Sequence, residues 1–276
     1  MKDYLKALIR RHDPLRARNV VREYLQARVL LAMQGAGAMT TLAFQGGTCL
    51  RFLYSLPRYS EDLDFALEGN REAYDLPKYL KAVRADLGAE NYRVELRIRE
   101  HRAVHGAMAR FPGLLHELGL SPHRSEALAI RIEVDTNPPP GADCEISLVR
   151  RHVTLRLFHH DRASLLAGKL HAVLQRGYAK GRDLYDLIWY LSDPDWPAPN
   201  LSLLNAALRQ TGWTGAELTA RSWTEPVVER LRALDWEQAI ADVRPFLEEQ
   251  NDIDVIASEN ALRLLARSGP TRYRSL

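Results

Sequence analysis

Two aspartates stand two residues apart in the stretch RYSEDLDFAL, residues 58–67. Because side chains alternate along a strand, Asp62 and Asp64 are expected on one face, while the apolar residues beside them point into a core. Like charges on one face repel each other, so the arrangement requires compensation. Mg²⁺ in proteins is typically held by one or two carboxylates, and substrate phosphates and water complete its shell. The pair predicts a divalent-cation site, with neutralisation by Arg51 or Arg58 as the alternative.

A pair of glycines precedes these aspartates in FQGGTCL, residues 44–50. Gly46 and Gly47 follow an apolar run and open a short helical pattern, where glycine lets the backbone approach an anion closely. A helix N-terminus adds N–H donors and a partial positive charge. Thr48 is expected to cap this helix or to bond a phosphate oxygen. The pattern predicts a phosphate-binding turn, although a plain tight turn also explains two glycines.

A third acid is expected if the site uses two metal ions. The stretch AIRIEVD alternates apolar and charged residues and places Arg131, Glu133 and Asp135 on one face. Either acid can complete a carboxylate triad. Glu133 is preferred because it lies mid-strand, whereas Asp135 stands beside the turn at Asn137 and is suited to capping it.

Hydrophobic periodicity indicates the elements that must position these side chains. Helices are expected at 14–34, 48–55 and 77–87, and strands at 39–44, 62–67, 92–99, 128–135 and, as one or two strands, 144–158. The stretch 100–127 is ambiguous. From residue 161 onward nearly every segment has helical periodicity. The sequence therefore predicts an α/β (α+β) domain with a mixed sheet over residues 1–158, followed by a helical bundle over residues 159–276.

Composition sets few further limits. The 276 residues carry a formal net charge of only +3, which permits a nucleic-acid partner without requiring one. The two cysteines match no zinc or disulfide pattern, and the N-terminal residues have no apolar signal segment. A cytoplasmic protein without a membrane partner is expected.

Together these motifs resemble a known family. GGTCLR, then RYSEDLDF, then a strand with a mid-strand acid, are similar to the nucleotidyltransferase fold of the DNA polymerase β superfamily. The later stretch ASLLAGKLHAVLQRGYAKGRDLYDLIWYL resembles the lysine and R-D-x-Y-D pattern of the AbiEii/AbiGii toxins, which include the MenT toxins. The resemblance covers about residues 40–192.

The resemblance implies a set of site residues. For nucleotide binding it implies Gly46, Gly47, Thr48, Arg58, Ser60, Lys169 and Arg176. For catalysis it implies Asp62 and Asp64, which would hold Mg²⁺ or Mn²⁺, together with Lys169 and either Asp183 or Asp186. Glu133, from the strand pattern, is expected to act as a third metal ligand or as the base. Lys169 stands in an otherwise apolar or small run, and Asp183 is expected to orient it or an arginine. Arg162, Lys169, Arg176 and Lys180 have the spacing of a basic helical stripe that Gly177 interrupts.

The resemblance also implies a function. It predicts a toxin of a type IV toxin–antitoxin or abortive-infection system that transfers a nucleotide from a nucleoside triphosphate to the 3′ end of tRNA or another RNA. A cognate antitoxin is expected to act without a stable complex. The alternatives are a small-molecule nucleotidyltransferase of the aminoglycoside type and a GTP-binding toxin without catalysis.

Overall fold

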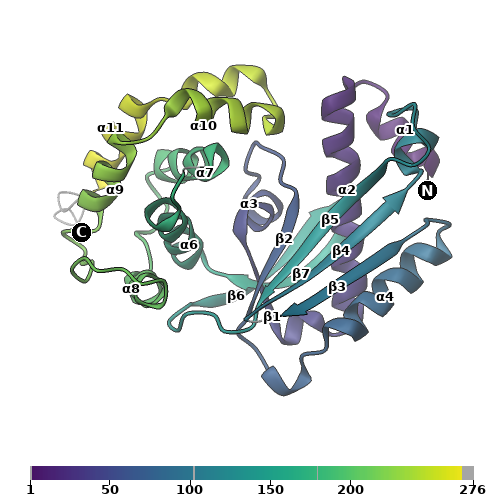
Figure 1. The fold of residues 1–276 in the computed structure, drawn as a ribbon, viewed down its shortest axis with the longest axis horizontal. Coiled ribbons are helices and arrows are strands. Elements are labelled where there is room, and N and C mark those ends of the chain that lie inside the picture. Colours follow the sequence, from purple (N-terminus) through teal and green to yellow (C-terminus); the bar gives the residue numbers. More distant parts are fainter. Residues whose placement is uncertain (1, 102, 179, 269–276) are drawn as a thin grey trace. The chain divides into compact units, whose positions relative to one another are not determined.

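The structure is a computed structural model that describes residues 2–101, 103–178 and 180–268 and divides into two units (Figure 1). The first unit comprises Met1–Pro138 and Glu145–His159, and the second comprises Pro139–Cys144 and His160–Leu276. The segment 139–144, which ends at the first residue of a strand of the sheet, thus groups with the helical part of the chain.

The first unit is built on a seven-stranded mixed sheet with the order β3-β4-β5-β2-β1-β7-β6. β2 pairs in parallel with β5, and β1 with β7, whereas β1–β2, β3–β4 and β4–β5 are antiparallel. The strands are β1 (Leu42–Gln45), β2 (Asp62–Leu67), β3 (Glu95–His101), β4 (Val104–Pro112), β5 (Ala127–Asp135), β6 (Cys144–Arg151) and β7 (Val153–His160). The predicted α/β class with a mixed sheet is confirmed.

Helices cover the apolar face of this sheet. They are α2 (Pro14–Gly35), α3 (Gly46–Tyr54), α4 (Leu76–Ala89) and α5 (Leu114–Glu117), while α1 (Lys2–Ile9) packs on α2. α2 packs against α4 and β5, and α4 also contacts β3. Leu63 and Phe65 of β2 and Ile132 of β5 are buried in the core beneath these helices. Their neighbours in sequence point to the opposite face, which is where the acidic side chains lie.

One sequence expectation differs in detail from the structure, and two points that the sequence left open are resolved. The predicted strand 39–44 starts later, because Ala38–Thr40 form a 3₁₀ turn before β1. The ambiguous stretch 100–127 contains the long strand β4, whose small residues, such as Ala107 and Ala109, obscure its period. The region 144–158 forms two strands, which separate at His152 with a left-handed φ of 58°.

The second unit is helical within its described residues. It contains α6 (Arg162–Gln175), α7 (Gly181–Ser192), α8 (Leu201–Gln210), α9 (Thr224–Arg232), α10 (Trp236–Val243) and α11 (Ser258–Ser268). α7 contacts α6, α10 and α11, and its largely buried side chains form the centre of the unit. None of the helices in the described part of the chain is both long and apolar enough to cross a membrane.

Candidate active site

Asp62 and Asp64, called the acid pair below, lie on the open face of β2. The burial of β2 alternates at this end, with both aspartates partly exposed while Leu63 and Phe65 are buried. Phe65 lies opposite Phe44 of β1, with ring centroids 5.3 Å apart, and this packing fixes the strand that carries the acids. The acid pair is therefore held on a rigid element, as a catalytic or metal-binding site requires.

Glu133 is the acid that lies beside the pair. The parallel register of β2 and β5 sets Asp64 directly opposite Glu133, whereas Asp135 is opposite Ala66 and thus one step further along. Opposed residues on neighbouring strands share a face. Asp135 accepts a hydrogen bond from the backbone N–H of Asn137 at 2.9 Å, and burial raises the pKa of its carboxyl. The geometry favours Glu133 as the third carboxylate and Asp135 as a turn residue.

Arg131 is a site residue whose role the sequence reasoning missed. Its Nε lies 3.8 Å from Oδ1 of Asp62, and its Nη1 lies 3.4 Å from Oε1 of Glu133. The charge of Asp62, above all, raises the pKa of the guanidinium. Arg131 was placed on the correct face of its strand, but only the pairing of β2 with β5 brings it to the aspartates.

The carboxylates suit a hard divalent cation in type, since Mg²⁺ prefers oxygen ligands. Across residues 2–101, 103–178 and 180–268, no group of three or more His, Cys, Asp and Glu side chains is placed so that it could hold a metal ion. The predicted triad therefore stays a prediction: the strand register sets Asp64 opposite Glu133, and Arg131 contacts Asp62 and Glu133. The fit to a metal rests on the three carboxylates of Asp62, Asp64 and Glu133 and on their position on one face of the sheet.

The glycine turn lies against the acid pair. Gly46 begins α3 with a left-handed φ of 78°, and a Cβ built on it would overlap the Asp64 carboxylate. A Cβ on Gly47 would lie 2.5 Å from Nη2 of Arg58 and 3.2 Å from Oγ of Ser60. The start of α3 thus meets a carboxylate, a guanidinium and a hydroxyl. Only residues without a side chain allow this approach.

Thr48 does not have its predicted capping role. The N-cap position of α3 is Gln45, and the buried Thr48 hydroxyl donates a hydrogen bond to the backbone carbonyl of Asp62. This bond ties the first turn of α3 to the first residue of β2. The physical reason is position: Thr48 lies inside the helix, where its side chain points into the protein. Only its backbone N–H can face an anion.

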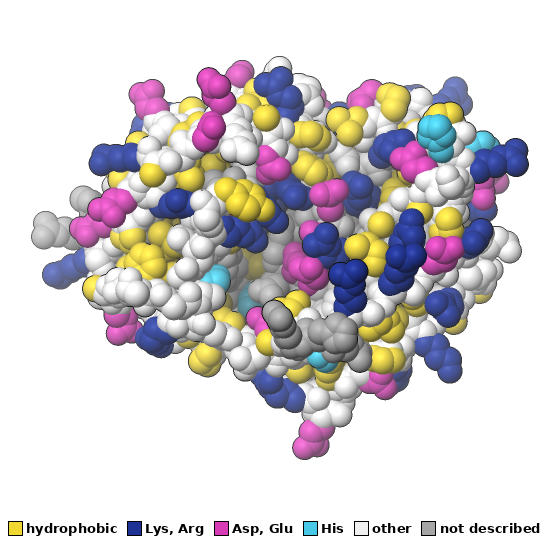
Figure 2. Space-filling view, in the orientation of Figure 1, with side chains coloured by type: hydrophobic (Ala, Val, Ile, Leu, Met, Phe, Trp, Pro, Cys, Tyr) yellow, Lys and Arg dark blue, Asp and Glu magenta, His cyan; other side chains and the backbone are white. Residues whose placement is uncertain are grey.

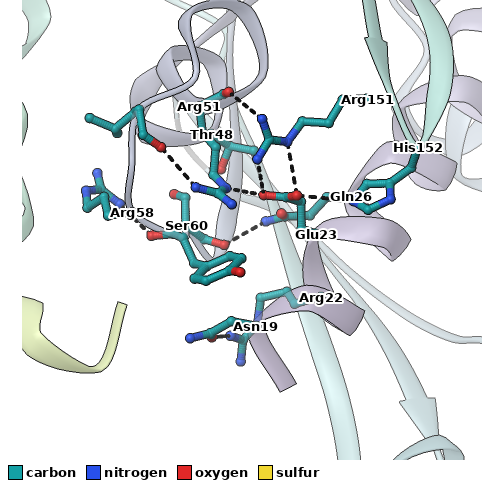
Figure 3. A network of polar contacts seen from close by, with 12 residues as sticks. Asn19, Arg22, Glu23, Gln26, Thr48, Arg51, Arg58, Ser60, Arg151 and His152 are labelled. Atoms are coloured by element: carbon teal, nitrogen blue, oxygen red, sulfur yellow. Dashed lines mark hydrogen bonds and ion pairs between the residues drawn. The ribbon is translucent and has the colours of Figure 1, made fainter. Parts of the chain in front are cut away.

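A buried ionic network holds the loop that carries Arg58 and Ser60 (Figure 3). At its centre is Glu23 of α2, which pairs with Arg51 of α3 and with Nε of Arg151 at 3.0 Å. Arg51 also donates to the carbonyl of Leu56 at 2.9 Å, and its guanidinium lies 4.1 Å from the ring centroid of Tyr59.

The network also reaches the loop of Arg58 and Ser60 through α2. Gln26 donates from Nε2 to the backbone carbonyl of Ser60 at 3.1 Å, one helical turn from Glu23. Burial alone raises the pKa of Glu23, but a hydrogen bond from His152 and the charges of Arg51 and Arg151 outweigh it and lower the pKa from 4.5 to about 2. Glu23 is therefore ionised throughout the physiological range, and its charge anchors α3 and the loop after it.

The predicted residues of the helical unit form a separate ionic cluster within that unit. Nζ of Lys169 lies 3.0 Å from Oδ1 of Asp183 and 2.6 Å from Oδ2 of Asp186, and Arg176 pairs with the other oxygen of Asp183. Asp186 is fully buried. Two cations and two anions make the cluster neutral. The basic stripe does not form, because α6 ends at Gln175 and α7 begins only at Gly181.

An acid pair on a mixed sheet, next to a helix that starts with two glycines, is the arrangement of a nucleotidyltransferase. The family model described as nucleotidyl transferase AbiEii toxin, type IV TA system, matches residues 28–262. The chain therefore belongs to the AbiEii family of nucleotidyltransferase toxins.

Solved structures share this fold. JHP933 from Helicobacter pylori shares 15% identity at a TM-score of 0.56, with 92% of each chain covered. MenT4, a nucleotidyltransferase toxin from Mycobacterium tuberculosis, shares 16% identity at a TM-score of 0.56, with 98% of this chain and 92% of MenT4 covered. At this identity the likeness shows the fold alone. No curated protein matches the sequence.

Proposed function

We propose that this nucleotidyltransferase joins a nucleoside monophosphate, taken from a nucleoside triphosphate, to the 3′ hydroxyl of an RNA, with tRNA as the first candidate. The observation that supports this most directly is the register that sets Asp64 opposite Glu133, with the glycine turn of α3 against Asp64. MenT4, which shares the fold at 16% identity, is described as a nucleotidyltransferase toxin. A cytoplasmic location is proposed with it, because its substrates are found there.

The chain's own residues would act mainly by positioning charge. Backbone N–H groups at Gly46 and Gly47, with Arg58 and Ser60, would bind the phosphate oxygens of the triphosphate. The acceptor oxygen would attack the α-phosphorus, the bond to the pyrophosphate oxygen would break, and Glu133 would accept the hydroxyl proton.

A divalent ion would be held by the carboxylates of this face. Asp62, Asp64 and Glu133 would bind Mg²⁺ or Mn²⁺, which when bound supplies charge stabilisation at the phosphates. In this arrangement Glu133 serves either as a ligand or as the base, and the variant Glu133→Gln separates these roles. Loss of metal affinity identifies a ligand, whereas loss of turnover at unchanged metal affinity identifies the base.

The direct test is incubation with each α-labelled nucleoside triphosphate, Mg²⁺ and total RNA. The wild type should label RNA and release pyrophosphate, and Asp64→Asn should reduce labelling by about a hundredfold or more. Asp86→Asn, an exposed acid of α4, is the matched control and should behave like the wild type. Labelling that survives Asp64→Asn would place the reaction elsewhere.

The same assay separates the two alternatives. A small-molecule enzyme would release pyrophosphate with an aminoglycoside and not with RNA. A GTP-binding toxin would retain GTP and release no pyrophosphate with any acceptor. A cognate antitoxin, which we propose acts without a stable complex, should relieve toxicity on co-expression yet fail to co-purify with the chain.

The proposed phosphate contact of Lys169 needs its own test, because Lys169 also neutralises buried acids. Lys169→Met alone should lower the free energy of unfolding by about 3–5 kcal/mol, since it removes the cation that lies against the fully buried Asp186 carboxylate. Pairing it with Asp186→Leu should restore much of that stability. If Lys169 contacts phosphate, the double variant stays inactive. If transfer returns with stability, Lys169 has a structural role only.

A further inference from the structure

The strand register places four arginines on the same face as the acid pair. One row across the sheet reads Asp62, Arg131, Met108 and Arg97, and the next reads Asp64, Glu133, Gly106 and Arg99. Arg110 lies two residues beyond Met108 along β4, hence on the same face. Neighbouring strands are about 4.8 Å apart, so these arginines extend roughly 14 Å from the acids to the edge strand β3.

The three outer arginines are not explained by ion pairing. Among the described residues, Arg97, Arg99 and Arg110 make no ion pair with a carboxylate. Glu95, the acid opposite Arg110, pairs instead with Arg93 at 2.9 Å. Figure 2 shows Lys and Arg side chains gathered over this part of the sheet. Such uncompensated charge on an exposed face favours polyanions.

The centre of the face also lacks bulk. Gly106 stands between Glu133 and Arg99 and carries no side chain, and the nearest atom to a Cβ built there is a backbone oxygen 4.0 Å away. Met108 separates Arg131 from Arg97 and offers an apolar contact. Charged groups alternating with open and apolar positions suit a flexible chain of phosphates and bases rather than a compact ligand.

We infer that Arg97, Arg99, Arg110 and Arg131, called the arginine track, bind the phosphates of a single-stranded acceptor RNA whose 3′ end reaches the acid pair. This inference deepens the proposed function and rests on it for the role of the acid pair. It assigns Arg131 a position at the reacting end and Arg97 and Arg99 positions upstream in the acceptor. The strand would cross β5, β4 and β3 in that order.

The test measures binding of a fluorescein-labelled single-stranded RNA by anisotropy, without nucleotide, over a series of salt concentrations. Arg97→Gln with Arg99→Gln should weaken binding about tenfold and reduce the slope of log affinity against log salt by about 1.4, since each phosphate contact on a single strand contributes about 0.7. The matched control is Lys81→Gln with Arg84→Gln, two exposed cations of α4, and should bind like the wild type.

Each outcome bears on the track separately from the proposed function. The track would be overturned by any of three results: an equal loss of RNA affinity in both double variants, no loss of affinity in either, or a wild type that does not bind the RNA. If transfer to RNA depends on Asp64 but RNA binding is unchanged by substitution of Arg97 and Arg99, the proposed function survives and the track fails. If the track variants lose RNA binding while the wild type transfers no nucleotide, the track survives and the proposed function fails.

Discussion

Glu23 gives the sharpest test of how the site is held. Its pKa of about 2, against an ordinary value of 4.5, means that the folded protein favours its charged form. The pKa is lowered by about 2.5, and at about 1.4 kcal/mol per pKa unit this carboxylate contributes roughly 3–4 kcal/mol of stability. Glu23→Gln should lose about this amount, and it also leaves the cation of Arg51, only 2% exposed, without its anion.

The sign of the pH dependence follows from the direction of the shift. Because the folded pKa of Glu23 is lowered, its contribution is fully present above the unfolded pKa of about 4.5 and is lost as the pH falls toward about 2. Urea unfolding of wild type and Glu23→Gln at a series of pH values measures it. The difference between the two free energies of unfolding should be constant above about pH 5.5 and shrink below pH 4.5.

The control is an acid of similar type in a solvated pair. Glu117 pairs with Lys2 and its side chain is 50% exposed, so Glu117→Gln should change stability by less than about 1 kcal/mol. If Glu23→Gln costs no more than Glu117→Gln, or if its cost does not vary with pH, the buried network does not stabilise the fold as argued. Asp64-dependent labelling of RNA should also be lower in Glu23→Gln, because Arg51 and the loop of Arg58 and Ser60 lose the charge that anchors them.

Three further predictions concern single residues. Gly46→Ala should reduce nucleotide transfer about a hundredfold, since a Cβ displaces the acid pair, and Gly35→Ala, with open space around it, should not. Equal activity would show that the turn is not tied to the acids. Gly181→Ala should lower the free energy of unfolding by about 1–3 kcal/mol through overlap with the backbone of α10, whereas Gly177→Ala should be nearly neutral. Matching melting temperatures would refute that contact. Arg131→Gln should tighten Mn²⁺ binding, measured by calorimetry, because it removes a cation beside the carboxylates; weaker binding would contradict this.

Local patterns were sufficient to predict the elements that carry the acid pair. The alternation in DLDFAL predicts β2 at its observed bounds, Asp62–Leu67. The same period predicts β5 and places Glu133 on its charged face. The helix 14–34 corresponds closely to α2, whose start is fixed by Asp13 as N-cap. These features depend on neighbours in the chain, which a sequence displays.

Contacts between distant segments could not be predicted in this way. Glu23 and Arg51 are 28 residues apart, and nothing in their local sequence links them. The same holds for Arg131 and Asp62, which meet only because β2 and β5 pair in parallel with one register. Thr48 shows the converse error: its local pattern suggested a cap, but the helix begins two residues earlier and turns the hydroxyl inward.

The charges next to the acid pair indicate how it can be stable. Asp62, Asp64 and Glu133 together carry three negative charges, and Arg131 supplies one positive charge in contact with two of them. The remaining charge of minus two equals that of one divalent ion in magnitude, so the protein alone compensates for one such ion. A second ion would need the phosphates of the bound triphosphate as its main ligands, which is the usual way Mg²⁺ is held in such sites. Metal binding should therefore depend on nucleotide beyond the first equivalent.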